Sequence, residues 1–190
     1  MIEQNRFIMI GATSRNVGKT EFACQLIQQV AQTQAVLGVK VTTVAERDGQ
    51  CPRGGQGCGV CSSLADAYCI TEETSPPPEK DTARLLQAGA ESVFWLRVLK
   101  DHLAEGMEAL LEQMPAHLPV VCESNSARLV LAPSVFVVVR PRQDDVVKPS
   151  CEAVMDQADV VVTYDGMGWD TQPNRCVWTE NQWLFKKRSL

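Results

Sequence analysis

Short runs of apolar residues alternate along the chain with longer stretches in which apolar residues recur every three or four positions. Uninterrupted apolar runs are typical of strands buried on both faces, and the longer periodic stretches are typical of helices with one buried side. We expect strands at residues 7–10, 36–44, 93–98, 119–122, 135–139 and 159–163, with a last strand or ribbon at 178–185. We expect helices at residues 19–32, 81–88, 101–114 and 150–157. Buried strands separated by helices predict an α/β fold with a doubly wound, mostly parallel sheet flanked by helices.

One long segment follows neither pattern. Residues 46–78 contain four cysteines, several glycines and the run Pro76-Pro77-Pro78, and their apolar residues show little periodicity. Glycine and proline interrupt helices and strands, so we expect an irregular, cysteine-rich insertion here. The 190 residues of the chain are the usual length of one domain. We therefore predict a single domain over residues 1–190 that carries the insertion within it.

Charge and hydropathy narrow the range of functions. The formal net charge of −5 at pH 7 disfavours a nucleic-acid binder that works through a basic face. The longest apolar run, at residues 135–139, is far shorter than the roughly 20 residues that cross a bilayer. The opening residues Met-Ile-Glu-Gln-Asn-Arg do not form a charged and then apolar export signal. We expect a cytoplasmic protein without a nucleic-acid or membrane partner.

The clearest motif is a phosphate-binding loop. The first expected strand runs into Gly-Ala-Thr-Ser-Arg-Asn-Val-Gly-Lys-Thr and then directly into a helix. Gly18-Lys19-Thr20 is the end of a P-loop, in the strand–loop–helix context that this motif requires. Main-chain amides of such a loop converge on phosphate oxygens, the lysine reaches the β- and γ-phosphates, and the threonine hydroxyl can ligate Mg²⁺.

The loop departs from the usual spacing of the motif. Thr13 stands where the first glycine is expected, and the nearest glycine is Gly11. A longer loop still fits this chemistry because most of its contacts come from the main chain. The alternative is a chance Gly-Lys-Thr sequence on a surface helix. The residues expected to contact the nucleotide are Gly11, Thr13, Ser14, Arg15, Asn16, Val17, Gly18, Lys19 and Thr20.

Acidic residues are candidates for the rest of a magnesium–nucleotide site. Open α/β sheets place such residues beyond the carboxyl ends of their strands. Glu123 directly follows an apolar run, so we expect Glu123 and Thr20 to serve Mg²⁺ while Lys19 stabilises phosphate charge during catalysis. Asp48 follows another expected strand and is a weaker candidate, because acids in polar loops are usually only solvated.

Three further segments, taken together with the P-loop, match the sequence pattern of a known protein family. They are Val39-Lys40-Val41-Thr42, Val121-Cys122-Glu123-Ser124 and the stretch Lys-Asp-Thr-Ala-Arg-Leu-Leu-Gln-Ala-Gly-Ala at residues 80–90. Together with residues 11–20 they resemble protein B of molybdopterin–guanine dinucleotide biosynthesis, discontinuously over residues 1–140. The stretch at residues 80–90 is the most discriminating of these segments.

The resemblance carries expectations about function. It implies a GTP-binding P-loop protein that hydrolyses nucleotide weakly, of the same broad class as dethiobiotin synthetase and the nickel-insertion GTPases. It implies that the protein assists attachment of a nucleotide to the molybdenum cofactor, with a cofactor-assembly protein as partner. It also implies a place in the nucleotide site for Asp81, whose alternative role is to cap a helix beside a solvated Arg84.

The cysteines divide into two groups. Cys51, Cys58, Cys61 and Cys69 lie close together in the insertion, and four thiolates suit tetrahedral ligation of Zn²⁺ or an iron–sulfur cluster. The spacing does not choose between these metals, and a redox-active Cys-x₂-Cys pair or unligated thiols are the alternatives. The bound metal is either coupled to the nucleotide state or purely structural. The scattered cysteines are expected in the core: Cys24, Cys122, Cys151 and Cys176.

These features predict a Mg²⁺-dependent protein that binds GTP or ATP, hydrolyses it slowly and serves molybdenum cofactor assembly. Three alternatives stay open: a metallochaperone or metal-sensing GTPase, a small-molecule kinase or ligase of the dethiobiotin synthetase type, and a non-enzymatic nucleotide-binding module with a structural zinc. The sequence does not determine whether the nucleotide base is guanine or adenine, because the chain lacks an Asn-Lys-x-Asp sequence. Contact with the base is a candidate role for Thr163-Tyr164-Asp165. We expect packing or a homodimer contact, and not a cofactor site, to be the role of Trp169, Trp178 and Trp183.

Overall fold

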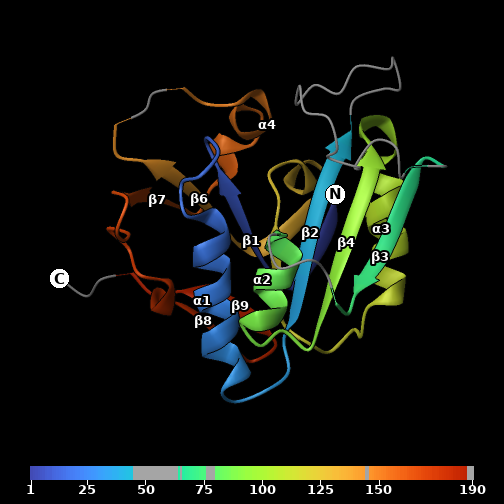
Figure 1. The fold of residues 1–190 in the computed structure, drawn as a ribbon, viewed down its shortest axis with the longest axis horizontal. Helices are drawn as coiled ribbons and strands as arrows, with labels where there is room; N and C mark the ends of the chain where they lie inside the picture. The colour runs from blue at the N-terminus through green and yellow to red at the C-terminus, as the bar shows by residue number, and fades with distance from the viewer. Residues whose placement is uncertain (45–63, 65, 76–79, 144–145, 188–190) are drawn as a thin grey trace.

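The fold is built on one mostly parallel sheet (Figure 1). The computed structural model describes residues 1–44, 64, 66–75, 80–143 and 146–187. Its strands are β1 Ile2–Ala12, β2 Leu37–Val44, β3 Tyr68–Glu73, β4 Ser92–Leu99, β5 Val120–Glu123, β6 Leu131–Pro141, β7 Val160–Tyr164, β8 Cys176–Thr179 and β9 Gln182–Phe185. Its α-helices are α1 Lys19–Ala31, α2 Asp81–Gln87, α3 Leu103–Gln113 and α4 Pro149–Glu152.

The order of strands in the main sheet is β3-β4-β2-β5-β1-β6-β7. Every neighbouring pair in this order is parallel except β3 and β4, which are antiparallel. The sheet therefore confirms the expected α/β fold with mostly parallel strands. Strands β8 and β9 form a separate antiparallel hairpin.

Two apolar layers cover the sheet. Helices α1 and α2 pack on one face together with the β8–β9 hairpin, and α3 and α4 pack on the other (Figure 1). The inward side of α1 shows why its sequence forms a helix here: Phe22, Leu26, Ile27 and Val30 recur at helical spacing and are all buried. The strands near the centre of the sheet are buried on both faces, as parallel sheets require.

The hairpin covers the amino-terminal half of β1. Trp183 of β9 is fully buried, and its indole N–H donates to the main-chain oxygen of Arg6 at 3.0 Å. The main-chain N–H of Trp183 donates to the hydroxyl of Ser134 on β6, also at 3.0 Å. Trp178 lies edge-on to Trp183, with ring centroids 5.8 Å apart. Packing therefore accounts for this aromatic pair.

Strand β3 departs from the sequence prediction. It lies inside the segment expected to be wholly irregular, and its residues show no clean alternation of buried and exposed positions. Its ordering comes from antiparallel pairing along the length of β4, from Tyr68 opposite Val98 to Glu73 opposite Val93. This pairing is a long-range interaction that local periodicity does not report. The prediction of an irregular segment over the whole of residues 46–78 was therefore wrong at residues 68–73.

The helix expected at residues 150–157 is also different. It is divided into the one-turn helix α4 and a short 3₁₀ turn at Met155–Gln157. The remaining predicted helices agree with α1, α2 and α3, although α3 is preceded by a 3₁₀ turn at Lys100–His102. Among the helices that the structure describes, none is long and apolar enough to cross a membrane.

Candidate functional site

The candidate site lies at the carboxyl ends of β1 and β5. The chain leaves β1 through α1 and reaches β2 on one side, returns to β5, and then enters β6 on the other side of β1. Strand β1 is thus a point where the order of strands reverses. Ligands of open α/β sheets bind in the crevice beyond the carboxyl ends of strands at such a point.

The loop from β1 to α1 fits closely against its surroundings. Gly11 lies at the end of β1, where a Cβ atom would come within 2.6 Å of the side-chain oxygen of Asn125. Gly18 precedes α1 with a φ of 75°, a left-handed conformation that favours glycine. A Cβ atom on Gly18 would lie 3.1 Å from the ring of Tyr164 and 3.3 Å from the indole nitrogen of Trp169. Both glycines therefore allow contacts that a side chain would prevent.

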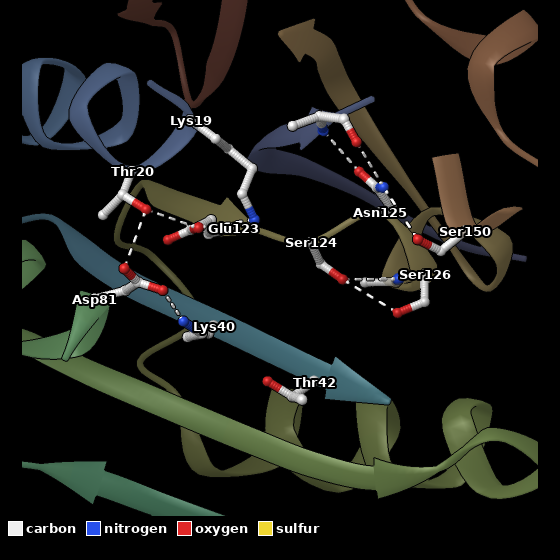
Figure 2. A network of polar contacts seen from close by, with 12 residues as sticks. Lys19, Thr20, Lys40, Thr42, Asp81, Glu123, Ser124, Asn125, Ser126 and Ser150 are labelled. Carbon is white, nitrogen blue, oxygen red and sulfur yellow. Dashed lines mark hydrogen bonds and ion pairs between the residues drawn. The ribbon is translucent and has the colours of Figure 1, made fainter. Parts of the chain in front are cut away.

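Lys19 and Thr20, the first residues of α1, converge on Glu123 at the end of β5 (Figure 2). The ammonium Nζ of Lys19 lies 2.8 Å from Oε1 of Glu123, and the Thr20 hydroxyl donates to the same oxygen at 2.9 Å. Glu123 is aligned with Ile10 of β1 in the strand register. The three residues that the sequence assigned to catalysis therefore form one cluster.

The second carboxylate oxygen of Glu123 has a different environment. The side chain of Glu123 is only 2% exposed, and its Oε2 is buried without a hydrogen-bond partner among the described residues. A buried carboxylate oxygen normally has a donor or a cation beside it, because desolvation without a partner is costly. Oε2 of Glu123 is therefore a carboxylate oxygen that lacks the donor or cation it would normally have among the described residues.

Asp81 enters the cluster from the first turn of α2. Its Oδ1 accepts a hydrogen bond from the Thr20 hydroxyl at 3.3 Å, and its Oδ2 forms an ion pair with Lys40 of β2 (Figure 2). Burial alone would raise the pKa of Asp81, but the charges of Lys40 and Lys19 and the hydrogen bonds from Lys40 and Thr20 outweigh burial and lower the pKa. Asp81 is therefore held as a carboxylate beside Thr20.

Asn125 fixes the start of the loop, a role that the sequence did not indicate. Its side-chain oxygen accepts from the main-chain N–H of Ala12 at 2.8 Å, and its side-chain nitrogen donates to the Ala12 oxygen at 3.0 Å (Figure 2). The same nitrogen donates to the Ser150 hydroxyl at 3.3 Å. Asn125 is buried, so this pair of hydrogen bonds satisfies both polar groups of a side chain that has little contact with water.

The structure places the other predicted loop residues in several environments. Thr13 and Val17 are buried, and the Thr13 hydroxyl has no hydrogen-bond partner in the described part of the chain. Arg15 and Asn16 are exposed, and Asn16 has a φ of 58°. Ser14 is partly exposed. Arg84 pairs with Glu21 at 2.6 Å on the surface of the α1–α2 layer, outside the cluster.

Lys148 also lies beside the loop, and no motif in the sequence indicated it. Its main-chain N–H donates to the oxygen of Thr13 at 2.9 Å. Partial burial, followed by the positive charge of Lys19, lowers the pKa of Lys148 to about 8; Cys151 and Glu123 oppose this effect, and Arg15 adds a smaller lowering contribution. The loop therefore has two lysines close enough to influence each other.

The cysteines fall partly outside the described residues. Cys51, Cys58 and Cys61 lie there, as does Asp48, and Cys69 lies on β3, where its sulfur accepts a hydrogen bond from Arg97 at 3.0 Å. Described residues before and within the insertion meet at β4: Val44 is paired with Leu99, whose N–H donates to the oxygen of Ala67 at 2.9 Å. Within the described ranges, no three His, Cys, Asp or Glu side chains are grouped as metal ligands.

The other four cysteines are buried, which confirms their prediction as core residues: Cys24, Cys122, Cys151 and Cys176. Burial raises the pKa of Cys122 and Cys176 to about 12 and that of Cys24 to about 11, while the pKa of Cys151 is also raised. Because the thiolate is the reactive form, these four thiols should resist labelling in the native protein.

Thiol labelling also tests the predicted metal site. We expect a maleimide at pH 8 to label none of the four buried cysteines until denaturant is added. If the insertion holds a metal, Cys58 should be protected in the purified protein and should react after chelation, as peptide mass spectrometry would show. Equal labelling of Cys58 before and after chelation would rule out metal ligation by that residue. Cys122 should stay unlabelled in both samples and serves as the internal control.

Trp169 packs against the start of α1. Its ring lies edge-on to Phe22, with centroids 5.3 Å apart, and 5.6 Å from the ring of Tyr164. Asp165 is exposed and accepts main-chain hydrogen bonds from Met167 and Gly168, which lower its pKa. Tyr164 therefore lies beside Gly18 of the loop, while Asp165 lies on the surface of the following turn.

Comparison of the chain with protein-family models, with curated protein sequences and with solved structures returns no match.

Proposed function

We propose that this protein binds a nucleoside triphosphate with Mg²⁺ and hydrolyses it slowly. The observation that carries the proposal is the meeting of Lys19, Thr20 and Glu123, because a P-loop enzyme needs a lysine, a hydroxyl and a carboxylate at this position. The loop before them ends in a left-handed glycine at the amino end of a helix of 13 residues. Such a helix end attracts anions through its free amide groups and its dipole.

Lys19 has two partners in this proposal. Without nucleotide, its ammonium neutralises the buried carboxylate of Glu123 at 2.8 Å. With nucleotide, it turns to the β- and γ-phosphate oxygens, where it offsets charge that develops during phosphoryl transfer. When Lys19 moves from Glu123 to the phosphates, Glu123 becomes available to a cation or to the nucleophilic water.

The donor set at this position fits Mg²⁺. The Thr20 hydroxyl and the carboxylates of Glu123 and Asp81 are oxygen ligands, which Mg²⁺ prefers, and Oε2 of Glu123 is buried without a partner among the described residues. Magnesium usually takes one or two protein carboxylates and completes its shell with water and phosphate oxygens. When bound, it would neutralise charge on the phosphates. Thr20 would ligate it, and Glu123 and Asp81 would hold its waters.

The proposed biological context is molybdenum cofactor assembly, with GTP as the first candidate and ATP as the second. The stretch at residues 80–90 supports it, because the resemblance depends most on this stretch and Asp81 within it contacts Thr20 of the loop. We propose Zn²⁺ or an iron–sulfur cluster as the metal of the cysteine-rich insertion. A cofactor-assembly protein is the proposed macromolecular partner.

Replacement of Glu123 by glutamine tests the proposed chemistry. We expect Glu123→Gln to keep measurable triphosphate binding, to lose the Mg²⁺ dependence of that binding and to hydrolyse nucleotide about 100-fold more slowly. Calorimetry with GTP and ATP, with and without Mg²⁺, and a phosphate-release assay measure these effects. Glu112→Gln is the matched control, because Glu112 is an exposed carboxylate of α3 on the opposite face of the sheet.

The same assays separate the proposal from its alternatives. Uptake of neither GTP nor ATP by the unmodified protein would contradict it. Phosphate release that requires a small-molecule acceptor would favour a kinase or ligase, and tight binding without turnover would favour a binding module. Metal affinity that changes with the bound nucleotide would favour a metallochaperone or metal sensor.

A further inference from the structure

We infer that Lys148, from the segment between β6 and α4, is a second triphosphate-binding cation of this site. The inference rests on the proposed function and adds to it a residue outside the P-loop motif. Three features carry it: the main-chain attachment of Lys148 to the loop, its position near two other cations, and the absence of an ionic partner for its ammonium in the described residues.

The main chain holds Lys148 against the loop. Its N–H donates to the Thr13 oxygen at 2.9 Å, while the N–H of Thr13 donates to the oxygen of Val139 on β6 at 3.0 Å. Two residues further on, the Ser150 hydroxyl accepts a hydrogen bond from Asn125, which also holds Ala12. Lys148 therefore has a fixed position relative to the first residues of the loop.

The side chain of Lys148 takes no part in this attachment. Lys148 is the residue that precedes α4, and it makes no side-chain capping hydrogen bond to that helix. The hydrogen bonds that hold Lys148 in place are made by its main-chain N–H and by its main-chain oxygen, which accepts from the main-chain N–H of Cys151 at 2.8 Å. A neutral side chain of similar length should therefore keep the attachment and remove only the charge.

Positive charges outnumber negative charges around Lys148. Lys19 and Arg15 act on it from the loop, and the carboxylate of Glu123 is the charged group that opposes them, because burial raises the pKa of the Cys151 thiol and disfavours its thiolate. Glu123 is already paired with Lys19 at 2.8 Å. Partial burial strengthens the repulsion among the cations, and the lowered pKa of Lys148 reflects both effects. A polyanion bound in the loop would replace this repulsion with attraction, because charge-assisted hydrogen bonds to phosphate are strong.

Binding measurements on Lys148→Gln and Lys148→Arg test the inference. We expect Lys148→Gln to weaken binding of GTP or ATP by about ten- to hundredfold, the effect of losing one hydrogen bond to a charged group. Lys148→Arg should bind within about threefold of the unmodified protein, because it restores the charge. The loss should be largest for the triphosphate and smallest for the monophosphate, and Lys148→Gln should bind with a weaker dependence on salt. Thermal unfolding should show that Lys148→Gln stays folded.

Lys187→Gln is the charge-matched control. Lys187 is an exposed residue that follows β9, and that strand packs near the amino-terminal half of β1, at the other end of the sheet from the loop. If the unmodified protein binds triphosphate and Lys148→Gln binds it equally well, the inference is wrong and the proposed function stands. If Lys148→Arg is as weak as Lys148→Gln, charge is not the cause and the inference is also wrong. If the unmodified protein binds no nucleotide, both the inference about Lys148 and the proposed function are wrong.

Discussion

Replacement of Lys19 by methionine should weaken GTP and ATP binding by about a hundredfold or more. The ammonium is the charged group that the loop directs toward the phosphates, and a hydrogen bond to a charged group contributes about 1.5–3 kcal/mol. Here the loss should be at the upper end, because we expect Lys19 to contact both the β- and the γ-phosphate oxygens. Isothermal titration calorimetry with both nucleotides measures the effect.

The same substitution should also destabilise the free protein. Lys19 pairs with a carboxylate that is 2% exposed, and its removal leaves Glu123 charged, buried and supported by the Thr20 hydroxyl. Breaking such a pair costs up to about 3–5 kcal/mol. The double variant Lys19→Met/Glu123→Gln removes both charges, so it should recover most of the stability while nucleotide binding stays weak.

The double variant separates a folding effect from a binding effect. Denaturant unfolding of the four proteins in this cycle gives the coupling energy between Lys19 and Glu123. Unchanged nucleotide affinity in folded Lys19→Met protein would contradict the proposed function. Recovery of nucleotide binding in the double variant would show that Lys19 acts only by neutralising Glu123.

Replacement of Asn125 by leucine should lower the free energy of unfolding by about 2–4 kcal/mol. The substitution removes both hydrogen bonds to Ala12 and leaves a buried N–H and a buried oxygen without partners, each of which costs about 1–3 kcal/mol. Denaturant unfolding followed by far-UV circular dichroism measures the loss. Asn174→Ala is the control, because Asn174 is exposed in the turn before β8 and should change stability little.

Gly11→Ala disturbs the same pair of hydrogen bonds from the other side. Its added methyl group would lie 2.6 Å from the Asn125 oxygen and 3.0 Å from the ring of Phe136, so Asn125 must move away from Ala12. The two single losses should therefore not add in the double variant. Gly168→Ala is its control, because a Cβ atom there meets nothing within 4 Å. Stability equal to that of the unmodified protein in both Asn125→Leu and Gly11→Ala would show that Asn125 does not hold the loop.

The parts of the fold and site that the sequence predicted have local causes. The central strands are apolar without interruption, and α1 has a buried side at helical spacing, so each is recognisable in a short window. Glu123 could be predicted because it directly follows an apolar run, which indicates a buried strand whose direction the α/β pattern already gives. Lys19 and Thr20 belong to a motif whose residues are adjacent in the sequence.

The features of the fold and the site that the sequence did not predict depend on contacts between residues far apart in the chain. Asn125 lies 113 residues after Ala12, and the two meet because β5 and β1 are neighbours in the sheet. Lys148 reaches Thr13 because β6 lies on the other side of β1. Strand β3 exists through its pairing with β4. None of these contacts leaves a periodic signal in a single segment of the chain.

The position of the β8–β9 hairpin has a consequence for synthesis of the protein. Residues 2–12 leave the ribosome before the hairpin, because Trp183, which covers the peptide of Arg6, follows 177 residues later. A nascent chain must therefore keep part of its first strand uncovered until the hairpin has emerged. Contacts this far apart in sequence slow folding, because a long loop must close before they form. During translation, this exposed strand would be a natural point of contact for a molecular chaperone.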